Sequence, residues 1–151
     1  MSIDGDVVAW TPRVSYRPVA RVRVGRTVAA HRAATAAIDL SDGLAAAVTQ
    51  LAGASGIGAT VDAAAIPVYL GAKAWHARTG ADPVLAALTG GEDYELLFAV
   101  PRRRRRGFFG AIARSGGISA TRIGELTTAT ALVLRQTDHN LVLPAGYSHL
   151  G

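Results

Sequence analysis

The sequence predicts an α+β (mixed α/β) fold, in which helices pack on a mixed sheet of about four to five strands. Short segments of alternating or continuous apolar residues are interspersed with segments whose apolar residues recur at helical spacing. Glycine or proline separates most of these segments. Half of the residues are hydrophobic but only 6% are aromatic, so small side chains must fill much of the core.

The amino-terminal segment lacks a steady period and ends at Tyr16-Arg17-Pro18. This predicts a leader or linker remnant over residues 1–16 and a single domain over residues 17–151. Residues 19–27 alternate between apolar side chains and arginine, which predicts an edge strand or extended arm. Residues 28–34 can add a short helix.

The strongest strand signal lies at residues 93–100, where apolar and polar side chains alternate. Other short apolar runs predict further strands at residues 36–40, 57–61, 121–126, 131–135 and 141–143. Helical spacing predicts helices from residue 44 to about residue 53, at residues 67–78, from residue 82 to Gly90, and at residues 101–114. Asp82 is the expected N-cap of the helix that ends at Gly90. Trp75 is expected in the core because it shares a helix face with Val68 and Ala72.

The composition excludes several classes of protein. Without cysteine, the chain can form neither disulfides nor a thiolate metal site, which favours a reducing cytoplasm. The first residues carry no signal-peptide pattern, and no run of eighteen apolar residues occurs, so we expect a cytoplasmic protein with no membrane partner.

The net charge of +5 raises nucleic acid as a partner. Residues 102–106 are five consecutive arginines, but no aromatic side chain is interleaved with them for base stacking. The run is typical of the solvated first turn of a helix, so nucleic-acid binding is the weaker interpretation.

The first candidate site is Ile38-Asp39-Leu40-Ser41-Asp42-Gly43, between a predicted strand and a predicted helix. On an extended segment Asp39 and Ser41 point to one side while the apolar residues point to the core. Carboxylates are preferred ligands of magnesium, and a helix N-terminus offers N–H groups to an anion. The alternative is that Ser41 or Asp42 caps the helix and Asp39 lies in water.

The second candidate site is Gly90-Gly91-Glu92-Asp93-Tyr94-Glu95, at the start of the predicted strand over residues 93–100. The two glycines permit a close backbone approach, and they place Glu92 and Asp93 at the start of the following strand. The alternative is a glycine helix end followed by solvated acids.

Together, IDLSDGL, GGEDYELLF, IGEL and the terminal GYSHL resemble the carboxy-terminal domain of thiamine-monophosphate kinase. That family lies within the superfamily of aminoimidazole ribonucleotide synthetase and selenophosphate synthetase. The resemblance runs from Arg17 to Tyr147, and the GGEDYEL motif is characteristic of the thiamine-phosphate branch.

The resemblance implies ATP-dependent phosphorylation of thiamine phosphate to thiamine diphosphate. By the family pattern, Asp39 and Asp42 hold Mg²⁺ and Ser41 meets the phosphates of ATP. Glu92 contacts thiamine phosphate, and Tyr147 packs on it. No dedicated catalytic nucleophile is expected, because phosphoryl transfer depends on positioning and charge neutralisation.

Two departures from the family pattern affect these expectations. The family usually ends in an acidic residue, a histidine and a phenylalanine, whereas this chain ends in Ser148, His149 and Leu150 before Gly151. The family's amino-terminal ATP-binding domain, which supplies most nucleotide ligands and much of a homodimer interface, does not precede Arg17. We therefore expect the chain alone to be inactive and to need such a domain as a partner. The alternatives are a non-catalytic ligand-binding or interaction domain of the same fold and, more weakly, a basic nucleic-acid-binding protein.

Overall fold

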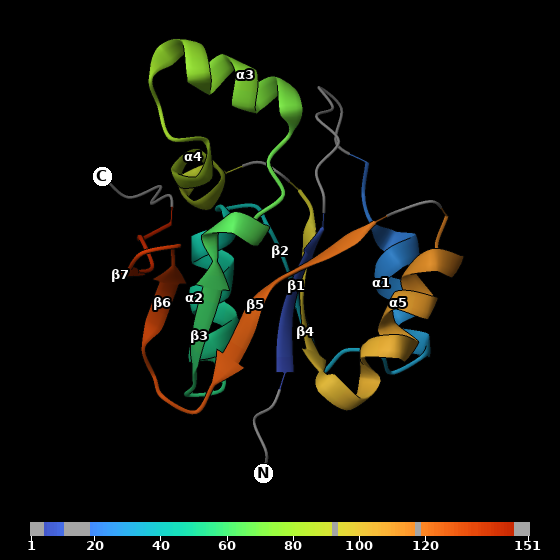
Figure 1. Ribbon diagram of the computed structural model, residues 1–151. Helices are drawn as coiled ribbons and strands as arrows, with labels where there is room; N and C mark the ends of the chain where they lie inside the picture. The colour runs from blue at the N-terminus through green and yellow to red at the C-terminus, as the bar shows by residue number, and fades with distance from the viewer. Residues whose placement is uncertain (1–4, 11–18, 92–93, 117–118, 147–151) are drawn as a thin grey trace.

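The computed structural model describes residues 5–10, 19–91, 94–116 and 119–146. Within them a central sheet carries helices on both faces (Figure 1). The strands are β1 (Gly5–Trp10), β2 (Ala36–Asp39), β3 (Gly58–Asp62), β4 (Leu96–Pro101), β5 (Ala120–Thr127), β6 (Leu132–Arg135) and β7 (Asn140–Val142). The helices are α1 (Val22–Ala30), α2 (Leu44–Gly53), α3 (Leu70–Thr79), α4 (Pro83–Thr89) and α5 (Arg105–Arg114), with 3-10 turns η1 (Ala63–Ala65) and η2 (Arg102–Arg104).

The strand order is β2-β4-β1-β5-β3-β6-β7. Neighbouring strands are antiparallel except β3 and β6, which pair in parallel. The mixed sheet confirms the predicted fold class, although the described residues form seven strands and not four to five. No helix in the described part of the chain is both long and apolar enough to cross a membrane.

Strand β4 divides the core between the two faces of the sheet. Leu97 and Ala99 pack with the buried face of α2 and with Leu88 of α4. Phe98 and Val100 pack on the other side with α1 and α5. Successive side chains of a strand point to opposite faces, so the apolar run in β4 serves both layers.

The structure differs from the sequence prediction at the amino-terminal end. Gly5–Trp10, assigned to a leader or linker, form β1 in the middle of the sheet, between β4 and β5. Val7 and Val8 are buried on opposite faces. A strand this short gives a weak local signal, and pairing with residues about a hundred positions away decides its conformation.

The predicted edge strand over residues 19–27 is also wrong, because helix α1 begins at Val22. Val24 and Val28 are one helical turn apart and both are buried against α5 and the sheet. The alternation of valine and arginine fits a strand as well as it fits the first turn of a helix. Packing of the Val24–Val28 face selects the helix.

Trp75 is not in the core. Helix α3 forms as predicted, but none of its residues is buried, and Trp75 is 56% exposed. Helical spacing defines a common face but does not determine whether another element covers it. The predicted cap of α4 is confirmed, since the Val84 amide donates to Oδ1 of Asp82 at 2.8 Å.

Candidate active site

The first candidate segment follows β2 and leads into α2. Leu40 is buried in the core, whereas Asp39, the last residue of β2, is exposed. Ser41 and Asp42 are half-buried in the turn. The alternation expected from the sequence is therefore present, with oxygen-bearing side chains outside and apolar ones inside.

Gly43 brings this turn against the end of α4. Its φ of 89° and ψ of 162° belong to a region that is essentially restricted to glycine. A Cβ atom there would lie 2.5 Å from the Gly90 carbonyl oxygen and 3.1 Å from that of Leu88. Gly43 is also the N-cap residue of α2, so neither Ser41 nor Asp42 occupies the capping position considered in the sequence analysis.

The second candidate segment lies directly beside the first. A Cβ on Gly91 would lie 2.8 Å from the Ser41 carbonyl oxygen. The Tyr94 amide donates to the Leu40 carbonyl at 3.3 Å, and the Leu40 amide donates to the Glu95 carbonyl at 2.8 Å. Two segments about fifty residues apart in sequence are thus joined by main-chain contacts. The predicted substrate residue Glu92, and its neighbour at position 93, lie outside the described residues.

A third segment from the carboxy-terminal end reaches the same place. Gly146 packs on the first turn of α2, where a Cβ atom would lie 2.7 Å from the Ala46 amide nitrogen. The predicted substrate residue Tyr147 follows it and lies outside the described residues. The described residues that precede positions 92 and 147 therefore both contact the Ser41–Ala46 stretch.

An ion pair between Arg21 and Glu95 borders this site and was not expected from the sequence. Arg21 donates to Glu95 from Nε at 2.8 Å and from Nη2 at 2.6 Å, and the Glu95 side chain is only 5% exposed. The hydrogen bond to Glu95 raises the pKa of Arg21 against the opposing effect of burial. No local pattern indicates this pair, because its members are 74 positions apart.

Tyr94 has an unusual backbone conformation beside the same pair. Its φ is 49°, a left-handed conformation that costs a non-glycine residue about 1–3 kcal/mol. Its side chain is 46% exposed. Tyr94 therefore departs from the strand over residues 93–100 predicted from the sequence, and regular β4 begins at Leu96.

The donor set at the turn suits a hard cation. Asp39, Ser41 and Asp42 offer only oxygen atoms, and magnesium is commonly held by one or two carboxylates with water and substrate phosphates completing the shell. Within the described ranges no group of three or more histidine, aspartate or glutamate side chains is placed to hold a metal ion. These residues fit a magnesium ion that is shared with phosphate oxygens.

The sequence matches a family model over residues 9–136, described as AIR synthase related protein, C-terminal domain. The chain belongs to this family. The match confirms the predicted superfamily, and it includes Gly5–Trp10 only in part.

Curated relatives of this AIR synthase related domain are thiamine-monophosphate kinases. That of Halobacterium salinarum is 40% identical over 129 residues, which cover 85% of this chain and 41% of the relative. That of Salmonella typhimurium is 41% identical over 111 residues, covering 74% of this chain and 33% of the relative. The chain thus spans about a third to two fifths of the length of these curated relatives. The recognised likeness to this kinase family is confirmed.

Solved structures share the fold. The thiamine-monophosphate kinase of Stenotrophomonas maltophilia aligns with a TM-score of 0.74 and 26% identity over 89% of this chain and 50% of that one. AaThiL, complexed with AMPPCP and TMP, aligns with a TM-score of 0.74 and 23% identity, and the alignment covers 99% of this chain and 52% of AaThiL. The hydrogenase maturation protein HypE of E. coli reaches a TM-score of 0.75 at 20% identity over 95% and 50%, which shows the common fold alone.

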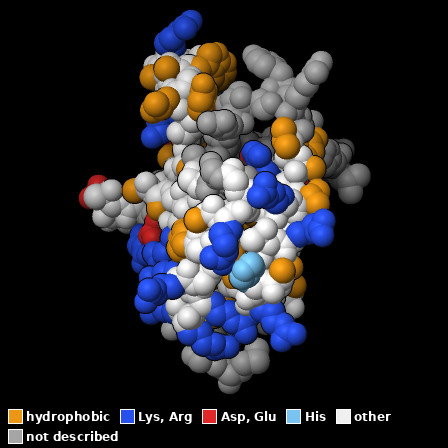
Figure 2. Space-filling view, turned by 90° about the vertical axis from the view of Figure 1, so that its right-hand side faces the viewer, with side chains coloured by type: hydrophobic (Ala, Val, Ile, Leu, Met, Phe, Trp, Pro, Cys, Tyr) orange, Lys and Arg blue, Asp and Glu red, His pale blue; other side chains and the backbone are white. Residues whose placement is uncertain are grey.

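A basic face lies on the α1–α5 side of this AIR synthase related domain. Figure 2 shows basic side chains spread over it, which in α1, η2 and α5 are all arginines, and none of these elements contains an acidic residue. Some arginines of the run at residues 102–106 make hydrogen bonds within the domain. Arg105 bonds the buried carboxylate of Asp6, and Arg104 donates to the Arg32 carbonyl at 2.8 Å.

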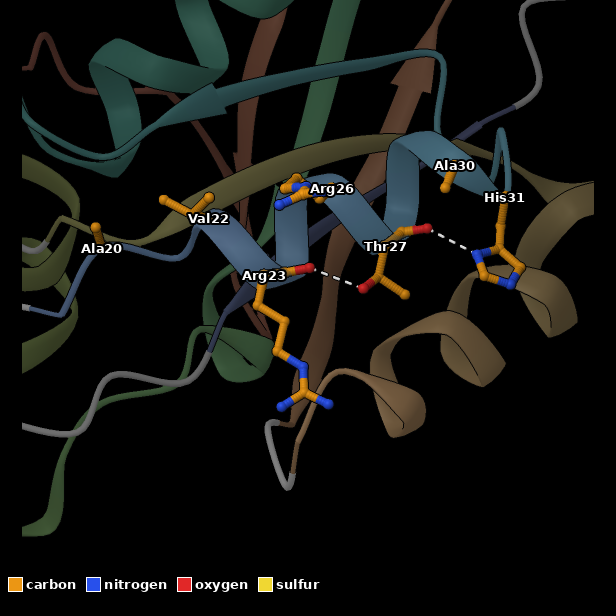
Figure 3. Close-up of a pocket in the computed structure, with 7 residues that line it drawn as sticks. All are labelled: Ala20, Val22, Arg23, Arg26, Thr27, Ala30 and His31. Carbon is orange, nitrogen blue, oxygen red and sulfur yellow. Dashed lines mark hydrogen bonds between the residues drawn. The ribbon is translucent and has the colours of Figure 1, made fainter.

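A groove of about 630 Å³ runs along the outer side of α1 (Figure 3). It is lined by Ala20, Val22, Arg23, Arg26, Thr27, Ala30 and His31. The Thr27 hydroxyl donates to the Arg23 carbonyl, and Nδ1 of His31 lies 2.8 Å from the Thr27 carbonyl. Since a carbonyl only accepts, Nδ1 carries the hydrogen in this bond. Neither Arg23 nor Arg26 has an acidic partner among the described residues.

Proposed function

We propose that this chain is the carboxy-terminal part of a thiamine-monophosphate kinase, which transfers the γ-phosphoryl group of ATP to thiamine phosphate with Mg²⁺. The observation that carries the proposal is the main-chain contact between residues 39–43 and residues 90–95. It joins described residues on both sides of positions 92 and 93 to the turn that contains Asp39 and Asp42. The 40% identity to a thiamine-monophosphate kinase supports the choice of substrate.

In this proposal each residue binds or orients, and none forms a covalent intermediate. A phosphate oxygen of thiamine phosphate attacks the γ-phosphorus, a new P–O bond forms, and the bond to the β-phosphate oxygen breaks to release ADP. Asp39 and Asp42 would hold Mg²⁺, which neutralises phosphate charge. Ser41 would meet the nucleotide phosphates. Glu92 would bind thiamine phosphate, and Tyr147 would stack on its cationic ring by cation–π attraction.

We further propose that an amino-terminal ATP-binding half completes the enzyme, in the same chain or as a partner, and that the complete enzyme is a cytoplasmic homodimer. The relatives are more than twice as long as the matched segment, which supports a second half. AaThiL is complexed with AMPPCP and TMP, and this supports ATP and thiamine phosphate as the two substrates.

The test mixes this chain with the amino-terminal half of the Salmonella typhimurium relative and follows transfer of labelled γ-phosphate to thiamine phosphate. Magnesium-dependent thiamine diphosphate formation is expected, and Asp39→Asn or Asp42→Asn should lower it by at least about tenfold. Asp138→Asn is the matched control, because Asp138 is exposed in the turn between β6 and β7. A folded mixture without product, or equal losses in all three variants, would contradict the proposal.

The α1 groove favours a second candidate function, the binding of a polyanion such as duplex nucleic acid through its phosphates. Arg23 and Arg26 lie on a surface without acids, which is the electrostatic pattern of phosphate-backbone binding. Fluorescence anisotropy with a labelled DNA duplex should then show affinity that falls steeply with salt.

Two double variants separate this function from general electrostatic attraction. Arg23→Ala/Arg26→Ala should weaken duplex binding, whereas Lys73→Ala/Arg78→Ala removes the same charge from exposed positions on α3 and should change it little. Equal losses in both variants, or no binding by the unmodified chain, would remove this candidate.

A further inference from the structure

Tyr94 lies in the second candidate segment, two residues before β4 begins at Leu96. A bulky residue with φ of 49° is a backbone outlier, and such outliers persist only where surrounding contacts hold them. Glycine would adopt the same conformation without strain. The presence of tyrosine therefore indicates that neighbouring contacts fix this position.

Main-chain hydrogen bonds on both sides of Tyr94 supply one set of these contacts. The Tyr94 amide donates to the Leu40 carbonyl, and the Leu40 amide donates to the Glu95 carbonyl. These bonds continue the pairing of β2 with β4, in which Asp39 lies opposite Leu96. Any shift of the Tyr94 backbone would consequently move Leu40, the residue that precedes Ser41.

The Arg21–Glu95 pair supplies the second set. Both Glu95 oxygens accept from the guanidinium, a two-point geometry that fixes orientation as well as distance. The side chains of Arg21 and Glu95 are 18% and 5% exposed, so solvent screens the pair weakly. Because Arg21 immediately precedes α1, the pair ties the start of that helix to the residue after Tyr94.

We propose that Arg21, Tyr94 and Glu95 form a clamp that positions residues 90–91 and 94–95 against residues 39–43 for binding of the phosphorylated substrate. This inference rests on the function proposed above. The three are positioning residues, and the clamp acts by limiting the conformations of the segment before the ligand arrives. A stiff tyrosine in a left-handed conformation serves that purpose better than glycine, which leaves the backbone free.

The experiment compares thiamine phosphate affinity with stability, using calorimetric titration in magnesium buffer and urea unfolding. Arg21→Lys keeps the charge but loses the two-point geometry, and it should weaken affinity at least fivefold. Arg102→Lys is the matched control, since Arg102 pairs with Glu125 at 3.2 Å and is 53% exposed. It should leave affinity within twofold of the unmodified chain.

Tyr94 variants separate positioning from simple stabilisation. Tyr94→Gly should leave the urea midpoint unchanged or raise it, because the strain is relieved, yet weaken affinity at least fivefold. Tyr94→Asn removes the ring but favours the left-handed conformation, so it should bind more tightly than Tyr94→Gly. Affinity and stability that fall in parallel across the series, or Tyr94→Gly binding like the unmodified chain, would overturn the clamp.

Amide hydrogen exchange tests the clamp in the absence of ligand. In Glu95→Gln, exchange at the Leu40 amide should accelerate at least tenfold, while the Val133 amide in β6 should change less than twofold. Acceleration of both amides alike, or of neither, would overturn the clamp. Absence of thiamine phosphate binding both by the unmodified chain and by its mixture with the amino-terminal half of the Salmonella typhimurium relative would instead contradict the proposed function, and the clamp would then be decided by this exchange measurement.

Discussion

Replacement of Gly43 by alanine tests the contact that joins the two candidate segments. The backbone at Gly43 has φ of 89°, and the added Cβ would lie 2.5 Å from the Gly90 carbonyl oxygen. The conformational strain and the overpacking each cost about 1–3 kcal/mol, so we expect a loss of about 3 kcal/mol or more in the free energy of unfolding. For a domain of this size, such a loss lowers Tm by roughly 6–12 °C.

Urea unfolding followed by circular dichroism measures this loss. With a slope of about 2 kcal/mol per molar, the midpoint should fall by about 1.5 M. Gly25→Ala is the matched control, because apart from its chain neighbours and the backbone of α1 no described atom lies within 4 Å of the added Cβ. Alanine in a helix interior should stabilise by about 0.5–1 kcal/mol. A Gly43→Ala protein within about 0.5 kcal/mol of the unmodified chain would refute the argument from close approach.

Three further replacements probe the rest of the fold by the same unfolding measurement. Phe108→Ala should cost about 3–5 kcal/mol, because Phe108 is fully buried against Phe98, and a loss below 1 kcal/mol would contradict this packing. Asp6→Asn should cost about 2 kcal/mol, since its buried carboxylate accepts from Arg105 and Arg122; an unchanged midpoint would argue against this network. Trp75→Ala should change stability by less than about 0.5 kcal/mol because the side chain is mostly exposed, and a larger loss would place Trp75 in a packed environment.

The elements with a local signal could be predicted from the sequence. Helix α2 shows its buried face in the spacing of Leu44, Val48 and Leu51, and α4 is marked by Asp82 and the proline after it. Strand β4 is predicted from the alternation that begins at residue 93, although the strand itself is a continuous apolar run because it is covered on both faces. In each case the residues that determine the element are neighbours in sequence.

Elements that depend on distant partners could not be predicted in this way. Strand β1 is defined by its pairing with β4 and β5, and α1 by the packing of Val24 and Val28 on α5. The Arg21–Glu95 pair joins residues 74 positions apart and leaves no periodic pattern. The roles expected for Asp39, Ser41, Asp42 and the residues at positions 92 and 147 stay predictions.

Glycine is the common feature of the three places where remote segments meet at the start of α2. From the sequence we expect a close backbone approach at Gly90-Gly91, whereas in the structure a Cβ atom at Gly43, Gly91 or Gly146 would collide with main-chain atoms of another segment. Backbone contact therefore limits the distance between the segments, and the exposed Asp39 lies at the edge of this contact. It follows that a change at Asp39 should alter ligand binding with little loss of stability, whereas changes at the glycines should alter both. A parallel loss of stability and binding in Asp39→Asn would show that the carboxylates belong to the scaffold itself.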